Sequence, residues 1–320
     1  MPRGIRKSFS AALLAGTVLT SSLAIAPAAS AAPRTTPTGA GAAAAAAANP
    51  CTSSAHPKMA RTLGNAIRSA LRGRTGTESV AVYDRKRHIY CAVDSSRHYD
   101  SASVVKATIL GALLRKVLDQ KRKMTSTEKS LAYKMITRSD NDAASSLWRS
   151  VGRTRMQRFL KQAGMSQTKL GPTHYWGLTQ ITARDQIRLL NVYTARNRIL
   201  SDKARNYGLG LMGKVISSQR WGTPTGRPSG VHWHVKNGWL PRHGRYWRVH
   251  SIGTFDGRGQ DYEIVVLTRD TPSMAYGIRT IERVARAVHN NLNPGMRSAY
   301  IESIPDSTWE TSDGSVPADR

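Results

Sequence analysis

Residues 99–108 read YDSASVVKAT, a stretch that places Ser103 three residues before Lys106. Side chains three residues apart share one face of a helix, so a helix beginning at Ser103 would bring its hydroxyl close to the Lys106 amine. The positive end of such a helix would favour a developing alkoxide on Ser103. The neighbours Val105 and Ile109 would partly desolvate Lys106 and favour its neutral form. We interpret the pair as a nucleophile and its base.

Two other Ser-x-x-Lys tetrapeptides occur in the chain and lack this setting. Ser126 and Lys129 belong to a polar segment that opens with a capping box, and Ser166 and Lys169 follow the predicted end of a helix. The tetrapeptide alone therefore identifies no site, and the interpretation depends on the surroundings of Ser103.

Two further motifs follow Ser103 along the chain. Residues 139–141 read SDN after the next predicted helix, and residues 236–238 read KNG within a predicted strand. Class A β-lactamases and penicillin-binding proteins carry Ser-x-x-Lys, Ser-Asp-Asn and Lys-Thr-Gly in this order. The chain resembles this superfamily over residues 52–292, with a variant third motif.

The predicted elements agree with that resemblance. Helical periodicity marks residues 56–74, 102–118, 125–139, 142–152, 153–164, 182–196 and 274–292, and period-two patterns mark strands within 79–93, 232–238, 248–255 and 262–270. This order predicts an α+β fold, with an α/β lobe whose mainly antiparallel five-stranded sheet is flanked by helices, and an inserted all-α lobe. A cleft between the lobes is the expected site.

The resemblance implies the roles of three catalytic side chains. Ser103 attacks a carbonyl and becomes acylated, and Lys106 takes its proton, directly or through a water. Ser139 relays a proton to the leaving nitrogen. Acylation of this kind needs no metal and no cofactor, and we expect neither.

The same resemblance implies a set of substrate-binding residues. Asn141 would bind the substrate amide, and Lys236 would supply positive charge near the substrate carboxylate. The third motif adds Asn237, where the family has Thr, and Gly238. The backbone N–H groups of the nucleophile and of Trp239 would form the oxyanion hole, and the ring of Trp239 is expected to narrow the cleft.

The loop between the second and third motifs departs from the family. Efficient class A enzymes carry a glutamate there, whereas residues 142–235 contain no Glu, and their only acids are Asp142, Asp185 and Asp202. The matching region, 170–180, reads LGPTHYWGLTQ. Two interpretations stay open: His174 activates water in place of the glutamate, or His174, Tyr175 and Trp176 simply pack the loop.

The N-terminal residues indicate export. Residues 1–31 combine basic residues, an apolar run and a small-residue end, which is typical of a signal peptide. Residues 32–50 are an Ala-rich linker, 52–292 the catalytic domain and 295–320 an acidic, disordered tail. We therefore expect a secreted protein, associated with the cell wall, that has no membrane span after signal cleavage.

Two cysteines, Cys51 and Cys91, are present in this predicted exported chain. An even count in an oxidising compartment favours a disulfide, which would tie the N-terminal segment to the sheet. Two free thiols are the alternative, and a zinc site is not expected because neighbouring ligands are lacking.

The formal net charge of +28 predicts attraction to polyanions. In an exported protein these would be anionic cell-wall polymers. The Lys and Arg residues are scattered and form no nucleic-acid recognition motif, so no specific nucleic-acid partner is expected. We expect a monomer.

Three functions fit the sequence. The first is a β-lactamase-like serine hydrolase, weak because the loop glutamate is absent. The second is a penicillin-binding protein that acts as a carboxypeptidase on D-Ala-containing peptidoglycan peptides. The third, from another class, is a non-catalytic cell-wall-binding protein, in which Ser103 would not be labelled by penicillin.

Overall fold

The computed structural model describes residues 48–172, 174–242, 246–296 and 298. The predicted signal peptide 1–31 and nearly all of the predicted linker and C-terminal tail lie outside these residues. The described elements run from Cys51 to Leu292, which is nearly the interval predicted for the catalytic domain.

All predicted helices and strands occur in the predicted order, and helix α7 and the short strands β1, β4 and β5 are additional. The helices are α1 (Pro57–Leu71), α2 (Val105–Asp119), α3 (Ser126–Thr137), α4 (Asn141–Val151), α5 (Arg153–Gln162), α6 (Ala183–Thr194), α7 (Asp202–Met212) and α8 (Met274–Leu292). The strands are β1 (Cys51–Thr52), β2 (Thr77–Asp84), β3 (Ile89–Val93), β4 (Tyr99–Asp100), β5 (Gln180–Ile181), β6 (His232–Arg242), β7 (Tyr246–Gly257) and β8 (Gln260–Thr271). Short 3-10 turns lie at η1 (Ala102–Val104), η2 (Trp176–Leu178) and η3 (Ser217–Gln219).

The main sheet is antiparallel throughout and has the strand order β1-β3-β2-β8-β7-β6. The five predicted strands are all present, and the two-residue β1 adds a sixth at one edge. In β1, Cys51 lies opposite Cys91 of β3, and the two form the predicted disulfide. The segment before α1 is thereby joined covalently to the sheet.

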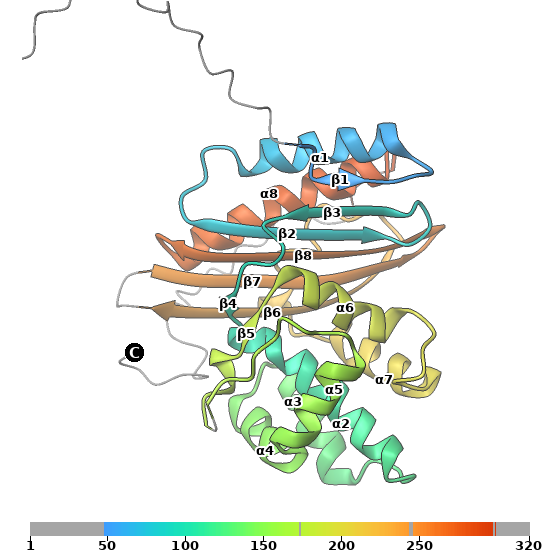
Figure 1. The fold of residues 1–320 in the computed structure, drawn as a ribbon, viewed down its shortest axis with the longest axis vertical. Coiled ribbons are helices and arrows are strands. Elements are labelled where there is room, and N and C mark those ends of the chain that lie inside the picture. The colour runs from blue at the N-terminus through green and yellow to red at the C-terminus, as the bar shows by residue number, and fades with distance from the viewer. Residues whose placement is uncertain (1–47, 173, 243–245, 297, 299–320) are drawn as a thin grey trace, which may run out of the picture. The chain divides into compact units, whose positions relative to one another are not determined.

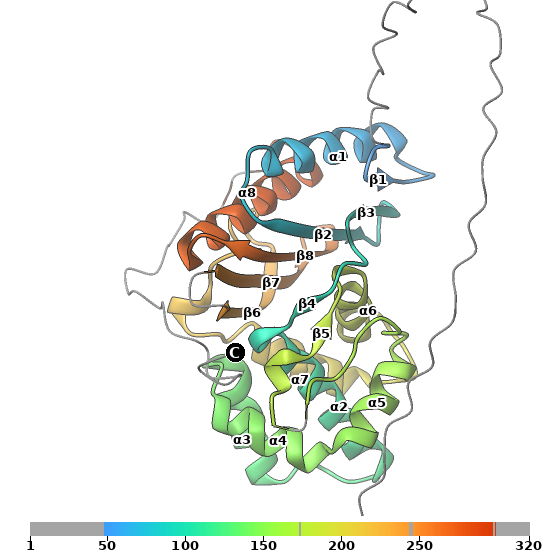
Figure 2. The ribbon, with the colours of Figure 1, turned by 60° about the vertical axis from the view of Figure 1, so that its left-hand side comes forward.

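Helices cover both faces of this sheet (Figure 1). Helices α1 and α8 lie together on one face, and the block from α2 to α7 lies on the other side, as the turned view also shows (Figure 2). This is the predicted arrangement of an α/β lobe with an all-α insertion between its strands.

Alternation along the strands divides the apolar side chains between two cores. On β2, Val80 and Val82 pack with α1 and α8, whereas Ala81 between them packs with the helical lobe. On β8, Val266 packs in the core with α1 and α8, and Val265 packs in the core with the helical lobe. Successive strand residues point to opposite faces, so a sheet covered on both faces needs these near-continuous apolar runs.

Helix caps explain several boundaries that the sequence predicts. The Thr125 hydroxyl accepts from the Glu128 N–H at 3.1 Å, and the Glu128 carboxylate accepts from the Thr125 N–H at 3.0 Å, which is the predicted capping box of α3. Thr182 caps α6 as predicted, accepting from the Asp185 N–H at 3.2 Å. Helix α7 was not predicted, because glycines interrupt its apolar pattern.

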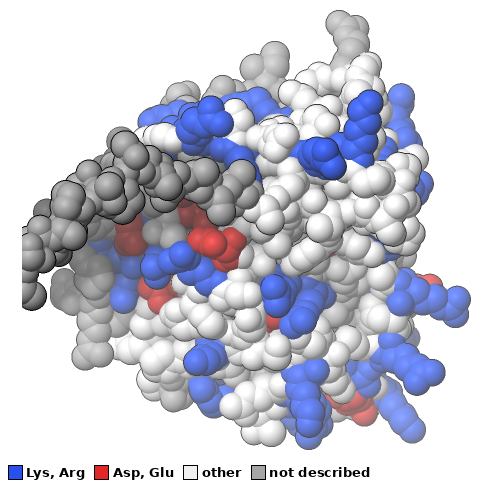
Figure 3. Space-filling view, turned by 45° about the horizontal axis from the view of Figure 1, so that its top comes forward, with Lys and Arg blue, Asp and Glu red and all other residues white. Residues whose placement is uncertain are grey.

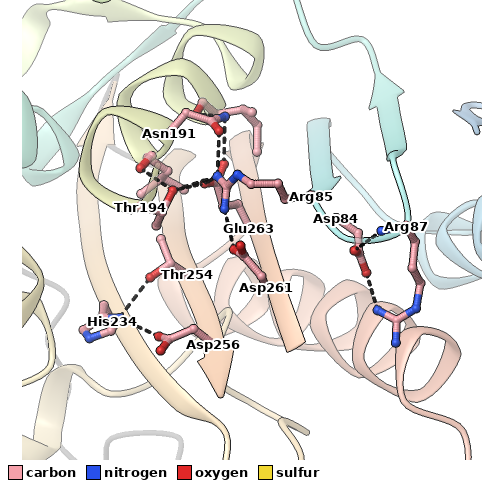
Figure 4. A network of polar contacts seen from close by, with 12 residues as sticks. Asp84, Arg85, Arg87, Asn191, Thr194, His234, Thr254, Asp256, Asp261 and Glu263 are labelled. Carbon is pink, nitrogen blue, oxygen red and sulfur yellow. Dashed lines mark hydrogen bonds and ion pairs between the residues drawn. The ribbon is translucent and has the colours of Figure 1, made fainter. Parts of the chain in front are cut away.

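A buried polar network fastens α6 to the sheet (Figure 4). Glu263 of β8 accepts hydrogen bonds from Thr194 at 2.6 Å and Asn191 at 3.1 Å, both on α6. Arg85, just after β2, donates to Glu263 at 2.9 Å and to both α6 residues. Burial raises the pKa of Glu263 to about 7, and the bonds from Thr194 and Arg85 only partly oppose this. The helical lobe is held to the sheet by these directional bonds.

Candidate active site

Ser103 lies in the 3-10 turn η1, immediately before α2. The sequence predicted that the helix would begin at this residue, and the α-helix itself begins two residues later. Ala102, directly before the serine, has a left-handed backbone with φ of 45°. A non-glycine residue in this region stores about 1–3 kcal/mol of strain, and such strain concentrates at functional sites.

Gly238 on β6 allows the strand to contact this turn. A Cβ added at Gly238 would lie 2.8 Å from both the Ser103 and the Val104 backbone nitrogens and 3.1 Å from the Ser101 carbonyl oxygen. A larger residue would therefore push the turn away from the strand. The third motif needs glycine here because strand and turn contact each other through backbone atoms.

The Lys106 amine lies at the centre of the site. Its Nζ is 2.6 Å from Ser103 Oγ, 2.6 Å from the Ser139 carbonyl oxygen and 2.6 Å from Asn141 Oδ1. The carbonyl and the amide oxygen can only accept hydrogen bonds, so each takes one N–H of the amine. The direction toward Ser103 then suits the lone pair of a neutral amine that accepts the serine proton.

Ser139 lies between the two lysines of the motifs. Its Oγ is 3.1 Å from Lys106 Nζ and 3.0 Å from Lys236 Nζ. The backbone of Ser139 is left-handed, with φ of 57°, and this conformation turns both its carbonyl and its hydroxyl toward Lys106. Lys236 donates to this hydroxyl, and Lys106 can also donate to it once it has taken the Ser103 proton and become an ammonium, so the hydroxyl proton is then free to point elsewhere.

We call Ser103, Lys106, Ser139, Asn141 and Lys236 the Ser103 cluster. Ser103, Lys106 and Lys236 have no exposed surface, Ser139 is 8% exposed and Asn141 is half-buried. The cluster therefore meets the surface at the second motif, with the nucleophile and its neighbouring amine below.

The side chains of Asn237 and Trp239 point away from the nucleophile. Asn237 donates to the carbonyl oxygens of Gln219 at 2.9 Å and Trp221 at 3.0 Å. The Trp239 ring packs edge-to-face on Trp221, at 6.1 Å between centroids, in the core beneath α1 and α8. Because Gly238 faces the turn, its two neighbours face the other side of the strand. The expectation that the Trp239 ring narrows the cleft is therefore wrong, and only its backbone is placed to contribute.

The loop of residues 171–179 brings Trp176, rather than His174, to the cluster. The Trp176 ring is 2% exposed, and its centroid lies 4.7 Å from Lys106 Nζ. Its indole N–H donates to Ser145 Oγ of α4 at 3.0 Å. His174 is exposed at the surface of the same loop. Sequence reasoning predicts only a packing role for Trp176, and no local pattern in the chain signals its contact with Lys106.

A family model described as the Beta-lactamase enzyme family matches residues 120–292, more than half of the chain. The chain belongs to the β-lactamase enzyme family. By this membership it is a serine hydrolase, as the three motifs predict. The matched interval begins after Ser103 and Lys106, so these two residues are placed in the site by the structure and the motif order.

Solved structures of this family share the fold. The TLA-1 extended-spectrum β-lactamase has a TM-score of 0.64 at 18% identity, covering 72% of this chain and 98% of that chain. A class A β-lactamase from Bacteroides cellulosilyticus gives 0.64 at 18%, covering 73% and 98%. PBP-A, in a mutant form with penicillin G as an acyl-enzyme, gives 0.61 at 18%, covering 72% and 96%. No curated protein matches the chain.

None of the three acids between the second motif and β6 is placed like the loop glutamate of the efficient class A enzymes. Asp185 is buried and accepts from the Gln167 N–H and the Thr168 hydroxyl, both at 2.8 Å. Asp202 is mostly exposed and pairs with Arg205, and Asp142 is exposed in the first turn of α4. None of these three aspartates can therefore replace the loop glutamate of the efficient class A enzymes.

His250 of β7 holds the segment that leads to the nucleophile. Its Nε2–H donates to the Asp100 carbonyl at 2.8 Å, and its Nδ1 accepts from the Thr268 N–H at 3.2 Å. Burial lowers the pKa of His250 to about 4, and the bond to Asp100 only partly opposes this. The imidazole is therefore neutral near pH 7, in a single tautomer fixed by two backbone groups.

Two kinds of feature are absent from the described parts of the chain. Within those ranges no three His, Cys, Asp or Glu side chains gather in a way that could hold a metal ion. Nor does any helix there combine the length and apolar character needed to cross a membrane.

Proposed function

We propose that the chain is an exported active-site serine hydrolase that forms an acyl-enzyme on Ser103 with β-lactams and releases it slowly. The observation that carries this proposal is the continuous contact from Ser103 Oγ through Lys106 Nζ and Ser139 Oγ to Lys236 Nζ, with steps of 2.6, 3.1 and 3.0 Å. All the groups needed to move a proton from a nucleophile to a leaving group lie in this line.

Acylation begins at Ser103. Its Oγ attacks the carbonyl carbon of the substrate, and its proton passes to the neutral Lys106 amine. Lys106 is oriented by its bonds to the Ser139 carbonyl and Asn141, so the proton acceptor is already in place. The backbone N–H groups of Ser103 and Trp239 are the candidates for stabilising the negative oxygen of the tetrahedral intermediate.

Ser139 completes acylation. The two lysines donate to its oxygen, so its hydroxyl proton is available for the leaving nitrogen as the carbon–nitrogen bond breaks. The ammonium formed on Lys106 then returns a proton to Ser139. The acyl group stays on Ser103, and the amine is released, or remains tethered in the case of a β-lactam.

The substrate class follows from family membership and from charge. A cyclic or linear amide with a nearby carboxylate suits a site in which the Lys236 ammonium lies behind Ser139. Both β-lactams and D-Ala-containing peptidoglycan peptides have this chemistry. Membership of the β-lactamase family favours β-lactams. The lack of a loop glutamate supports the alternative, a D-Ala carboxypeptidase.

Export and cell-wall association are part of the proposal. The disulfide between Cys51 and Cys91 is typical of proteins from oxidising compartments and supports secretion. On the face drawn in Figure 3, Lys and Arg side chains are spread among uncharged residues rather than gathered into one recognition patch. Such a surface suits diffuse attraction to anionic wall polymers, which should weaken steeply as salt rises.

Labelling with a fluorescent penicillin tests the proposal. Wild-type protein should become covalently fluorescent, and Ser103→Ala should not, whereas Ser126→Ala, in a polar Ser-x-x-Lys segment, should label like wild type. Chromogenic cephalosporin turnover, measured alongside, should be slow. Equal labelling of wild type and Ser103→Ala would reject Ser103 as the nucleophile. No labelling and no turnover of either a β-lactam or a D-Ala-D-Ala peptide would favour the non-catalytic wall-binding protein.

A further inference from the structure

Trp176 is fixed over the Lys106 amine by bonds from two directions. The indole N–H donates to Ser145 on α4 at 3.0 Å. The backbone just beyond the ring is tied to the nucleophile segment, because the Ser101 N–H donates to the Thr179 carbonyl at 2.9 Å. The ring is therefore held in one place relative to Ser103.

The loop around Trp176 also closes tightly on itself. A Cβ at Gly171 would lie 2.4 Å from the Tyr175 carbonyl oxygen and 3.0 Å from the Thr179 nitrogen, so its two ends are in backbone contact. The Gly171 N–H donates to Thr179 Oγ1 at 3.1 Å, and Arg153 donates to the Gly171 carbonyl at 2.8 Å. A loop closed in this way leaves the ring little freedom to swing out.

The ring acts on Lys106 in two ways. At 4.7 Å from Nζ, its face attracts the ammonium form of the amine and opposes loss of a proton from it. With 2% of its surface exposed, it also fills the space beside Lys106 on the loop side. The first effect bears on acylation and hydrolysis alike, because both need the neutral amine, so the filled space is what separates them: hydrolysis needs a water beside Lys106 and acylation does not.

We propose that Trp176 is a positioning residue that prolongs the acyl-enzyme by keeping water away from Lys106. This inference rests on the proposed function, since it requires an acyl group on Ser103. It goes beyond that function by naming the side chain that sets the lifetime, and it assigns the loop a blocking role rather than a catalytic one.

The step that Trp176 suppresses is ordinary ester hydrolysis. A water oxygen attacks the acyl carbon while one of its protons passes to the neutral Lys106 amine. The tetrahedral intermediate then breaks the bond between the carbon and Ser103 Oγ, and Lys106 returns the proton to that oxygen. The products are the free acid and the serine hydroxyl, and water is the only co-reactant.

Four variants of the full chain test the proposal. Trp176→Ala removes the ring, Trp176→Phe keeps a ring but not the indole N–H, and Ser145→Ala frees the ring from α4 with little loss of packing. Trp247→Phe, a buried tryptophan in the core beneath α1 and α8, is the matched control. Each protein is acylated with penicillin G, separated from free drug, and followed by intact mass for formation and decay of the adduct.

The expected result separates decay from formation. Trp176→Ala should shorten the adduct lifetime at least ~10-fold, because general-base catalysis of water attack is worth roughly 10²–10⁴-fold when fully arranged. Ser145→Ala and Trp176→Phe both remove the indole bond to α4 and should shorten it less, while Trp247→Phe should match wild type. All should still acylate within a few-fold of the wild-type rate. A merely structural role would instead slow acylation and leave the lifetime unchanged.

Failures of the two proposals look different in this experiment. If wild type forms no adduct, the proposed function is wrong, and the inference about Trp176 is overturned with it. If wild type forms the adduct but Trp176→Ala and Ser145→Ala decay at its rate, only the inference is overturned. If Trp176→Ala does not fold, the Ser145→Ala lifetime decides.

Discussion

The Ser103 cluster and the 171–179 loop meet at Lys106 and present opposite chemistry to it. On the cluster side, the amine contacts two hydroxyls, a carbonyl and an amide oxygen, all within 3.1 Å. On the loop side it contacts the face of Trp176, with no carboxylate between residues 143 and 184 in the sequence. One side can move protons, and the other excludes the water that would use them.

Under the proposed function, the two half-reactions of this serine hydrolase depend on separate parts of the chain. Acylation needs groups from α2, from the turn before α4 and from β6, and all are present. Deacylation needs a water beside Lys106 on the loop side, and the loop places an aromatic ring there instead. A chain can therefore retain the first half and lose the second through the loop alone.

Replacing the Lys106 amine should have the largest effect on the Ser103 cluster, because it removes the proton acceptor. Lys106→Met keeps an unbranched side chain only one atom shorter but cannot accept the Ser103 proton, so adduct formation should slow by roughly 10²–10⁴-fold. Intact-mass measurement of samples quenched at successive times after addition of excess penicillin gives this rate, and circular dichroism checks that the variant folds. Adduct formation within threefold of wild type would mean that another group takes the serine proton.

A methyl group at Gly238 should disturb the cluster by a purely steric route. Gly238→Ala places a Cβ 2.8 Å from the Ser103 and Val104 nitrogens, so the nucleophile turn must shift, and we expect adduct formation to fall roughly 10–100-fold, since a displacement near 1 Å can cost 10²-fold. Gly210→Ala is the control, because that helical glycine has open space around it. The control should keep wild-type rates and gain about 0.5–1 kcal/mol in stability. Equal rates for both variants would refute the close approach.

Acid should loosen the support of the cluster through His250. The pKa of this imidazole is lowered to about 4 by burial, from about 6.5 when unfolded, so its stabilising effect is complete above pH 6.5 and is lost as pH falls toward 4. The free energy of unfolding should drop by about 3 kcal/mol over that range from His250 alone. Urea titrations at several pH values should show a flatter profile for His250→Asn, whereas His232→Asn, at an exposed position, should follow wild type. Parallel profiles for His250→Asn and wild type would contradict this.

Removing the disulfide should lower stability but hardly change the chemistry at Lys106. The bond joins residues 40 apart, at the edge of the sheet away from β6, so Cys51→Ser with Cys91→Ser should cost about 3–4 kcal/mol of stability. Adduct formation and decay at 20 °C should change less than twofold. A large change in either rate would show that the edge strand β1 influences the site.

Sequence patterns predicted most of the fold because periodicity and caps are local signals. The structure confirms the predicted Thr125 capping box, the predicted Thr182 cap and the five predicted strands. Helix α7 was missed, since Gly208 interrupts its apolar pattern. That glycine is needed because the Tyr193 ring lies 2.5 Å from where a Cβ would be, a contact between helices that no local pattern reveals.

The site was predictable only where its residues carry motifs. Ser103, Lys106, Ser139, Asn141 and Lys236 follow the family order, and the structure brings them together. The direction of the Trp239 ring could have been derived from strand alternation with Gly238. The approach of Trp176 to Lys106 could not, because it depends on how a closed loop is fastened to α4 and to the nucleophile segment.

The most direct test of the account is the fate of a penicillin adduct on wild-type protein. After brief exposure to penicillin G, intact mass should show one equivalent of drug, peptide mapping should place it on Ser103, and the adduct should outlast its formation time by at least ~10-fold after free drug is removed. Rapid multiple turnover with no observable adduct would contradict the account, because it would mean that some group other than the missing glutamate, with exposed His174 the first to examine, activates water at this site.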